Sequence, residues 1–66
     1  MKVKVNGEEY EPRGAGTVLD LLRESGADGS RVAVMINDRV IPRADFGSVR
    51  LCEGDKIEIL TFMGGG

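Results

Sequence analysis

Apolar and polar residues alternate near both ends of the chain, and this alternation predicts strands with one buried face. Residues 1–5 (Met-Lys-Val-Lys-Val) place apolar side chains at every second position, and residues 56–59 (Lys-Ile-Glu-Ile) repeat the pattern. A period of two residues is typical of a half-buried strand. After Ile59 the order changes phase, so Leu60 and Phe62 are expected on the face opposite the two isoleucines.

Asn6-Gly7 separates the first strand from a second one. This dipeptide readily adopts the positive φ angles of a type I′ turn, which matches the twist of paired strands. We therefore expect a hairpin between residues 1–5 and residues 8–11, with Pro12 ending the second strand.

A third strand is predicted over residues 32–36 (Val-Ala-Val-Met-Ile), which are apolar at every position. Such runs are typical of central strands, which have a neighbour on each side. Asn37-Asp38 is a second tight-turn signal and should lead into a short strand over residues 39–41, which Pro42 terminates. The core side is assigned to Val32, Val34 and Ile36, and the opposite face to Ala33 and Met35.

The spacing becomes helical between the second and third strands. Thr17 is the expected N-cap, with Asp20 three positions later as the acidic half of a capping box. Ser25-Gly26 should end the helix. The side chains that recur at i, i+3 and i+4 should face the sheet, namely Val18, Leu21 and Leu22, with Leu19 beside them.

This order of elements predicts an α+β fold of the β-grasp (ubiquitin-like) layout, with a mixed sheet and one main helix on one face. The connection through the helix is too long for a hairpin and suits a crossover between parallel neighbouring strands. The remaining segments are expected to form a single helical turn (residues 43–47), an extended piece (49–52) and a turn (53–55).

Three glycines close the sequence, where no later element requires a turn. They predict a thin stalk that presents the carboxylate of Gly66 to a partner. We accordingly expect a β-grasp domain over residues 1–63 and a flexible tail over residues 64–66. The alternative is that a terminal glycine run is only a disordered end or a cloning remnant.

Composition favours a small binding or carrier domain over an enzyme. The 66 residues allow one domain with a small core and little room for a pocket. There is no histidine and a single cysteine, Cys52, so neither a structural zinc site nor an internal disulfide is expected, and the cytoplasm is the expected location. No signal peptide or membrane span is expected. A net charge of -2 argues against nucleic acid as a partner.

No group of residues predicts catalysis or metal binding. The carboxylates Glu8, Glu9 and Glu11 beside the first turn are better explained as a solvated edge than as an acid/base pair. Cys52 lacks a neighbouring histidine or basic cluster, so a half-buried structural role is preferred over a nucleophile or persulfide carrier. Gly14-Ala15-Gly16 lacks the lysine of a P-loop and the third glycine of a dinucleotide fingerprint.

The sheet face away from the helix is expected to be apolar near the tail. Ala33 and Met35 on one strand and Leu60 and Phe62 on another should form a patch there. We expect this patch to dock a partner, with Met35, Leu60, Phe62 and Met63 as the binding residues. The alternative is that residues 43–49 cover it.

Four segments together resemble the ThiS family of sulfur carrier proteins of thiamin thiazole biosynthesis. They are residues 32–38 (VAVMIND), 40–43 (VIPR) and 53–59 (EGDKIEI), and the terminal Gly65-Gly66. The short length and the Ile41-Pro42-Arg43 run favour this family over the related MoaD family of molybdopterin synthase. Gly64 is then an extra spacer before the family's glycine pair.

The resemblance implies a reaction at Gly66 in which all catalytic groups belong to other proteins. A ThiF-like enzyme would use ATP and magnesium to adenylate the Gly66 carboxylate. Sulfur from a cysteine desulfurase or another persulfide donor would then produce a thiocarboxylate. A ThiG-like thiazole synthase would take that sulfur while building thiazole phosphate from deoxyxylulose phosphate and a glycine-derived imine. This chain would itself bind no cofactor.

Three alternatives share the same fold. A MoaD-like carrier would supply sulfur for molybdopterin synthesis instead. A ubiquitin-like modifier would join Gly66 to lysine amines. A plain β-grasp interaction module would need no chemistry at its terminus.

Overall fold

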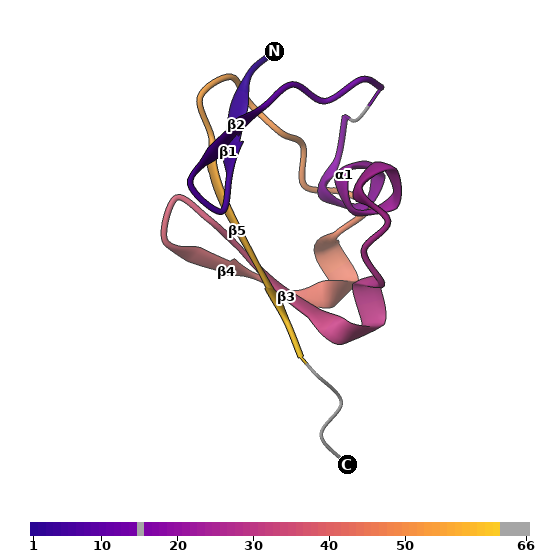
Figure 1. Ribbon diagram of the computed structural model, residues 1–66. Helices are drawn as coiled ribbons and strands as arrows, with labels where there is room; N and C mark the ends of the chain where they lie inside the picture. The colour runs from indigo at the N-terminus through magenta and orange to yellow at the C-terminus, as the bar shows by residue number, and fades with distance from the viewer. Residues whose placement is uncertain (15, 63–66) are drawn as a thin grey trace.

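The computed structural model describes residues 1–14 and 16–62 as a five-stranded mixed sheet with one α-helix packed on one face (Figure 1). This arrangement confirms the predicted β-grasp fold. The proposed boundary between domain and tail at residue 63 lies outside the described residues and stays a prediction. The elements are β1 (Val3–Val5), β2 (Glu8–Tyr10), α1 (Val18–Ser25), β3 (Val32–Ile36), β4 (Arg39–Ile41) and β5 (Lys56–Thr61), with short 3-10 helices η1 (Gly29–Arg31) and η2 (Arg43–Asp45).

The strand order is β2-β1-β5-β3-β4, in which β1 and β5 run parallel and the other neighbours are antiparallel. The connection through α1 therefore joins β2 to β3, two strands that run the same way but are not adjacent. The predicted crossover between parallel neighbours was wrong in this respect, because β1 and the last strand lie between them. Likewise β5, and not β3, is the middle strand, although β3 does have a neighbour on each side.

Both predicted two-residue turns are present. Asn6 and Gly7 have φ angles of 51° and 85°, and Asn37 and Asp38 have φ angles of 50° and 69°. Positive φ at both central residues is the requirement of a type I′ turn, and Asn, Asp and Gly tolerate it best. The turns therefore set the registers in which Val5 lies opposite Glu8 and Ile36 opposite Arg39.

Helix α1 begins and ends where its capping residues predict. The Thr17 side chain accepts a hydrogen bond from the Asp20 N–H, and the Asp20 carboxylate accepts from the Gly16 and Thr17 N–H groups. The hydrogen bonds to the carboxylate, above all the one from the Gly16 N–H, hold the pKa of Asp20 below its ordinary value. At the other end Gly26 adopts the left-handed conformation with φ 76°, which closes the last turn.

Glu24 ties α1 to the loop that follows β2. Its carboxylate accepts hydrogen bonds from the Tyr10 hydroxyl and from the Arg13 and Gly14 N–H groups. The hydrogen bond from Tyr10 is the main cause that lowers the pKa of Glu24, and the bond from the Arg13 N–H is the next. The hydrogen bond between Tyr10 and Glu24 also raises the pKa of Tyr10. A segment without regular structure is thereby fixed to the helix.

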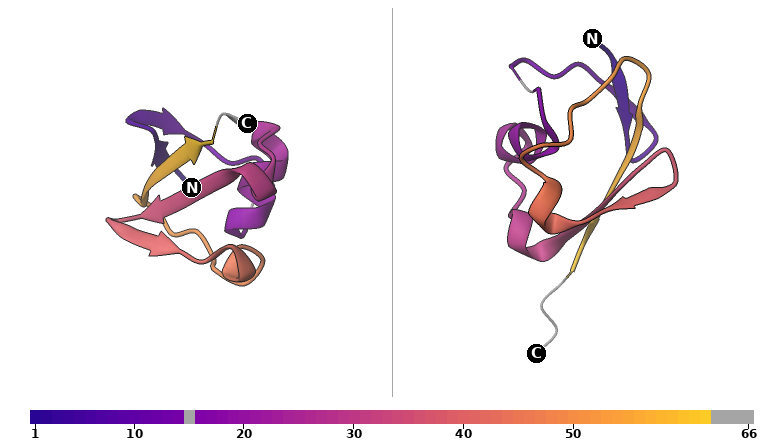
Figure 2. Two further views of the ribbon diagram at one scale, coloured as in Figure 1. Left: turned by 90° about the horizontal axis from the view of Figure 1, so that it is seen from below. Right: turned by 180° about the vertical axis from the view of Figure 1, so that it is seen from behind.

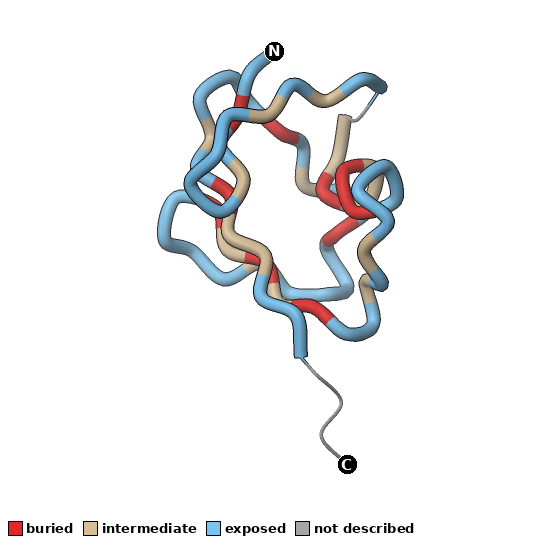
Figure 3. The backbone as a smooth tube through the Cα atoms, in the orientation of Figure 1, coloured by how far each residue is buried: buried red, intermediate tan, exposed pale blue. Residues whose placement is uncertain are grey.

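The core lies between the sheet and α1, and Figure 3 shows buried positions on both. Phe46 and Leu51 complete this core from the segment between β4 and β5, a contribution that the sequence pattern did not reveal. The Leu19 N–H donates to the Phe46 carbonyl at 2.8 Å, so this segment packs beside the helix. The buried residues are Val3, Val18, Leu21, Leu22, Val32, Val34, Ile36, Phe46, Leu51 and Ile57.

The segment from η2 to Val49 lies on the helix side of the sheet, as both views in Figure 2 show. The alternative that residues 43–49 cover the opposite, open face of the sheet was therefore wrong. The physical reason is that burial of Phe46 in the core draws this segment toward α1.

In the part of the chain that the structure describes, no helix combines the length and apolar character that a membrane crossing requires. Residues 1–14 and 16–62 also contain no group of three or more His, Cys, Asp or Glu side chains placed to hold a metal ion.

Candidate functional site on the open sheet face beside the tail

Strand β5 leads directly to the glycine tail from the middle of the sheet. It is paired with β1 along one edge and with β3 along the other. The Phe62 N–H continues the second of these ladders by donating to the Arg31 carbonyl at 2.8 Å. The expected partner-binding residue Met63 and the expected tail residues Gly64, Gly65 and Gly66 lie outside the described residues, so their roles stay predictions.

The predicted change of phase along β5 is confirmed. Ile57 is fully buried under α1, whereas Leu60 and Phe62 are 54% and 56% exposed. Because successive side chains of a strand point to opposite faces, Leu60 and Phe62 lie on the face that α1 leaves open. The last apolar residues before the tail are thus not part of the core.

Neighbouring strands place further apolar side chains beside Leu60. Ala33 lies opposite Leu60 in the β3–β5 register, and Met35 lies opposite Val40 in the β3–β4 register. We call Ala33, Met35, Val40, Leu60 and Phe62 the open-face patch. Four of its members are those that the sequence predicts.

Val40, the fifth member of the open-face patch, was missed by the sequence analysis although it is 70% exposed. The signal was present, because a two-residue turn at positions 37 and 38 forces Met35 and Val40 to pair and to share a face. Continuing the alternation of faces from residues 32–36 through the turn to residues 39–41 would have placed Val40 on the open face.

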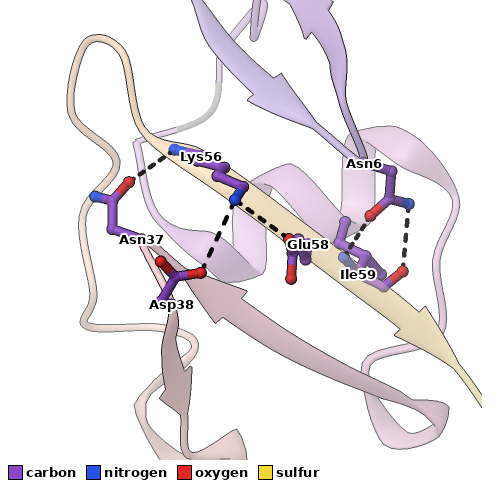
Figure 4. A network of polar contacts seen from close by, with 6 residues as sticks. All are labelled: Asn6, Asn37, Asp38, Lys56, Glu58 and Ile59. Carbon is purple, nitrogen blue, oxygen red and sulfur yellow. Dashed lines mark hydrogen bonds and ion pairs between the residues drawn. The ribbon is translucent and has the colours of Figure 1, made fainter.

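Charged residues occupy the rest of the open face. Lys56 lies near the Asp38 and Glu58 carboxylates, with Nζ–O distances of 3.9 and 3.8 Å (Figure 4). Lys4 lies opposite Lys56 in the β1–β5 register. These exposed ion pairs contribute little to stability. They divide the face into a charged half at the start of β5 and an apolar half at its end, next to the tail.

Other residues considered for chemistry lie away from the end of β5. Glu8, Glu9 and Glu11 are exposed on and just after β2, in agreement with a solvated edge. Cys52 precedes the start of β5 and is exposed, so the expectation of a half-buried cysteine was wrong. Its neighbour Leu51 takes the buried position, while the Cys52 N–H donates to the Asp55 carboxylate at the turn.

Comparison with known proteins identifies relatives along the whole chain. The model of the ThiS family matches residues 3–66. The sulfur carrier protein ThiS of Bacillus subtilis is 34% identical over 65 residues, which are 97% of this chain and 98% of that protein. A thiazole synthase of Paramagnetospirillum magneticum is 42% identical over 66 residues, all of this chain but 20% of that protein. The chain thus spans about a fifth of that relative, and likewise 20% of a thiazole synthase of Magnetococcus marinus.

A solved structure whose sequence identity to this chain is similar to that of these relatives confirms the fold. The crystal structure of the thiamine biosynthesis protein ThiS from Geobacter metallireducens superposes with a TM-score of 0.82. The two sequences are 36% identical, and the match covers both chains completely.

Proposed function

The chain belongs to the ThiS family of sulfur carriers, and from this premise we propose that the carboxylate of Gly66 is converted to a thiocarboxylate that supplies sulfur for thiazole formation. The observation that carries the proposal is the course of β5. The strand lies in the middle of the sheet and has an apolar patch on its open side. The last residue of this patch, Phe62, is four positions before Gly66. Such a body can dock on a partner while the glycines enter that partner's active site.

The chemistry requires activation, because a carboxylate is a poor electrophile. A carboxylate oxygen of Gly66 would attack the α-phosphorus of ATP on a ThiF-like enzyme, and pyrophosphate would leave. With hydrosulfide as the simplest nucleophile, a carbon–sulfur bond then forms while the carbon–oxygen bond to AMP breaks. The proposed source of the sulfur is a cysteine desulfurase or another persulfide donor, from which a thiol reductant releases hydrosulfide while the thiol is oxidised to a disulfide. The chain acts here as a protein substrate, and the partner enzymes supply catalysis, ATP and magnesium.

The open-face patch is the proposed docking surface for the adenylating enzyme. Leu60 and Phe62 present exposed apolar side chains within six residues of Gly66, with Met35 beside them on β3. Aromatic and methionine side chains are enriched in the centres of interfaces. Met63 would extend the same surface toward the tail. Docking here would bring the tail to the partner's active site without any rearrangement of the core.

A ThiG-like thiazole synthase is the proposed sulfur acceptor. Two proteins named thiazole synthase contain a segment similar to this entire chain as about a fifth of their length. A carrier and its acceptor that occur within one polypeptide are expected to act together. We place the reaction in the cytoplasm, where ATP and reduced sulfur are available.

Genetic complementation tests which biosynthetic product receives the sulfur. A strain that lacks this protein should require thiazole for growth, and the complete chain should remove that requirement. The chain truncated after Gly64 should not. Restored molybdenum-enzyme activity without restored thiazole synthesis would instead indicate a MoaD-like carrier. Complementation by the truncated chain would show an interaction module that needs no chemistry at Gly66.

A further inference from the structure

The side chain of Asn6 acts as an additional unit of strand β1. The backbone of β1 turns away after Val5, yet the Asn6 carboxamide continues along the edge of β5. Its oxygen accepts from the Ile59 N–H at 2.8 Å, and its nitrogen donates to the Ile59 carbonyl at 3.3 Å (Figure 4). A carboxamide carries the same donor and acceptor as a peptide group, so it can replace one residue of a neighbouring strand.

Asn6 makes the last hydrogen bond on its edge of β5 among residues 1–14 and 16–62. The backbone register between β1 and β5 ends at Val5 and Ile57, where the Asn6 N–H donates to the Ile57 carbonyl at 2.8 Å. On the opposite edge, bonding to the β3 side continues as far as Phe62. Strand β5 is therefore held on two edges up to Ile59 and on one edge from there to Phe62.

We propose that Asn6 is a positioning residue for the reaction at Gly66, an inference that rests on the proposed function. A strand end held along one edge only can tilt out of the plane of the sheet more easily than one held along both edges. The residues just beyond the Asn6 contact are Leu60 and Phe62, which belong to the open-face patch. Asn6 thus fixes the orientation of the end of β5, which carries Leu60 and Phe62 and precedes the tail in the sequence.

The length of the tail makes this direction important. Gly66 lies seven positions after Ile59, so a chain extended into a partner's channel would reach roughly 23 Å beyond Ile59. A tilt of the strand end by about 10° would then displace the far end of the extended tail by about 4 Å. Displacements of about 1 Å at a reacting atom are enough to slow a reaction strongly.

Asn37 provides a matched control in the same molecule. It too is the first residue of a two-residue turn, with φ 50° against 51° for Asn6. Its side-chain oxygen accepts from the Lys56 N–H at 3.0 Å, so it also holds β5, but at the end far from the tail. Glycine at either position removes the side-chain bonds and keeps the positive φ, because glycine adopts this conformation without strain.

The test compares Asn6→Gly, Asn37→Gly and the parent chain in thiocarboxylate formation with the activating enzyme, ATP, magnesium and sulfide. All three are measured at a temperature at which circular dichroism shows each to be folded. We expect kcat to fall on the order of tenfold for Asn6→Gly, even at saturating carrier, and by less than about twofold for Asn37→Gly. Amide exchange at Ile59 should accelerate only in Asn6→Gly. Asn6→Asp, which keeps the acceptor for the Ile59 N–H, should recover part of the lost rate.

Each outcome decides a different point. If both glycine variants lose the same rate in proportion to their stability, Asn6 is only structural and the proposal is wrong. If Asn6→Gly reacts like the parent chain, the proposal is wrong while the proposed function stands. If the parent chain itself forms no thiocarboxylate with its cognate enzyme, the proposed function is wrong and the positioning role falls with it.

Discussion

At the scale of single residues, the proposed chemistry depends most on the glycines before the C-terminal carboxylate. A narrow channel in a partner admits backbone without side chains, and glycine adopts conformations that a β-carbon forbids. The sequence reveals this need because three glycines follow the last apolar residues. It could not reveal Asn6, because Asn-Gly is fully explained as a turn signal and the side-chain contact with Ile59 depends on how β1 and β5 pair.

Gly65→Ala should therefore impair activation and leave the fold intact. The added methyl group would clash in a channel that fits glycine, so we expect a loss of at least about tenfold in kcat/KM for adenylation. The melting temperature should not change, because the core that residues 1–14 and 16–62 form ends at Ile57. Pyrophosphate release by the activating enzyme measures the rate. Full activity of this variant would show that no narrow channel encloses Gly65.

At the scale of elements, capping residues and turns proved the most informative parts of the sequence. The Thr17 capping box and the Gly26 terminus set α1, and the two Asn-containing turns set the hairpin registers. The order of the strands in the sheet was harder to predict, because no local sequence pattern indicates that β5 lies between β1 and β3. The packing of Phe46 against α1 was missed for the same reason, since it depends on a contact between segments distant in sequence.

Removal of the N-cap by Thr17→Ala should lower the free energy of unfolding by about 1 kcal/mol, because the Asp20 N–H loses its acceptor. Thr17→Ser keeps a hydroxyl at the same position and serves as the control, with a smaller expected loss. Urea denaturation measures both. An unchanged midpoint for Thr17→Ala would contradict the role given to this cap.

The Glu24 contact predicts how stability depends on pH. Its pKa is lowered in the folded state by the bonds from Tyr10 and Arg13, so the folded state binds fewer protons than the unfolded state near that pKa. The resulting stabilisation is complete above the ordinary glutamate pKa and is lost as the pH falls through the lowered, folded value. The melting temperature should accordingly decrease on acidification through this range.

Glu24→Gln should remove part of this acid dependence, because glutamine does not titrate. Glu9→Gln, at an exposed position on β2, is the matched control and should keep the slope of the parent chain. Thermal melts of the three proteins between neutral pH and the range where carboxylates protonate provide the comparison. The same slope in all three would show that Glu24 contributes nothing to acid stability.

At the scale of the whole molecule, the single α-helix among the described residues covers one face of the five-stranded sheet and leaves the other face open. The phase change along β5 allowed Leu60 and Phe62 to be placed on this open face from the sequence, and alternation along β3 did the same for Ala33 and Met35. Val40 was missed. The expected partners could be inferred only from the family resemblance, because the groups that would recognise the tail belong to other proteins. The described core residues all lie between Val3 and Ile57, so the proposed reaction at Gly66 would take place well beyond them in the sequence.

Phe62→Asp should separate folding from docking. The side chain is 56% exposed, so its loss should change the free energy of unfolding by less than about 0.5 kcal/mol. Binding to the adenylating enzyme should weaken by on the order of 2 kcal/mol or more, as the loss of an aromatic anchor does. Calorimetric titration measures the affinity.

Thr61→Asp is the matched control for this docking variant. It introduces the same charge at the adjacent exposed residue, whose side chain points to the other face of the sheet. Its effect on affinity should be much smaller. If Phe62→Asp unfolds the protein, or if the two variants weaken binding equally, the open-face patch is not the docking surface.

The central claim is that Gly66 carries sulfur, and the intact mass of the protein after reaction tests it most directly. The chain is incubated with its cognate adenylating enzyme, ATP, magnesium and a sulfur source, and a chain extended by one residue after Gly66 is the control. The account predicts the replacement of one oxygen by sulfur at the C-terminal glycine of the parent chain and no change in the extended chain. An unchanged mass of the parent chain with its cognate partners, or covalent attachment of Gly66 to lysine amines in its place, would contradict it.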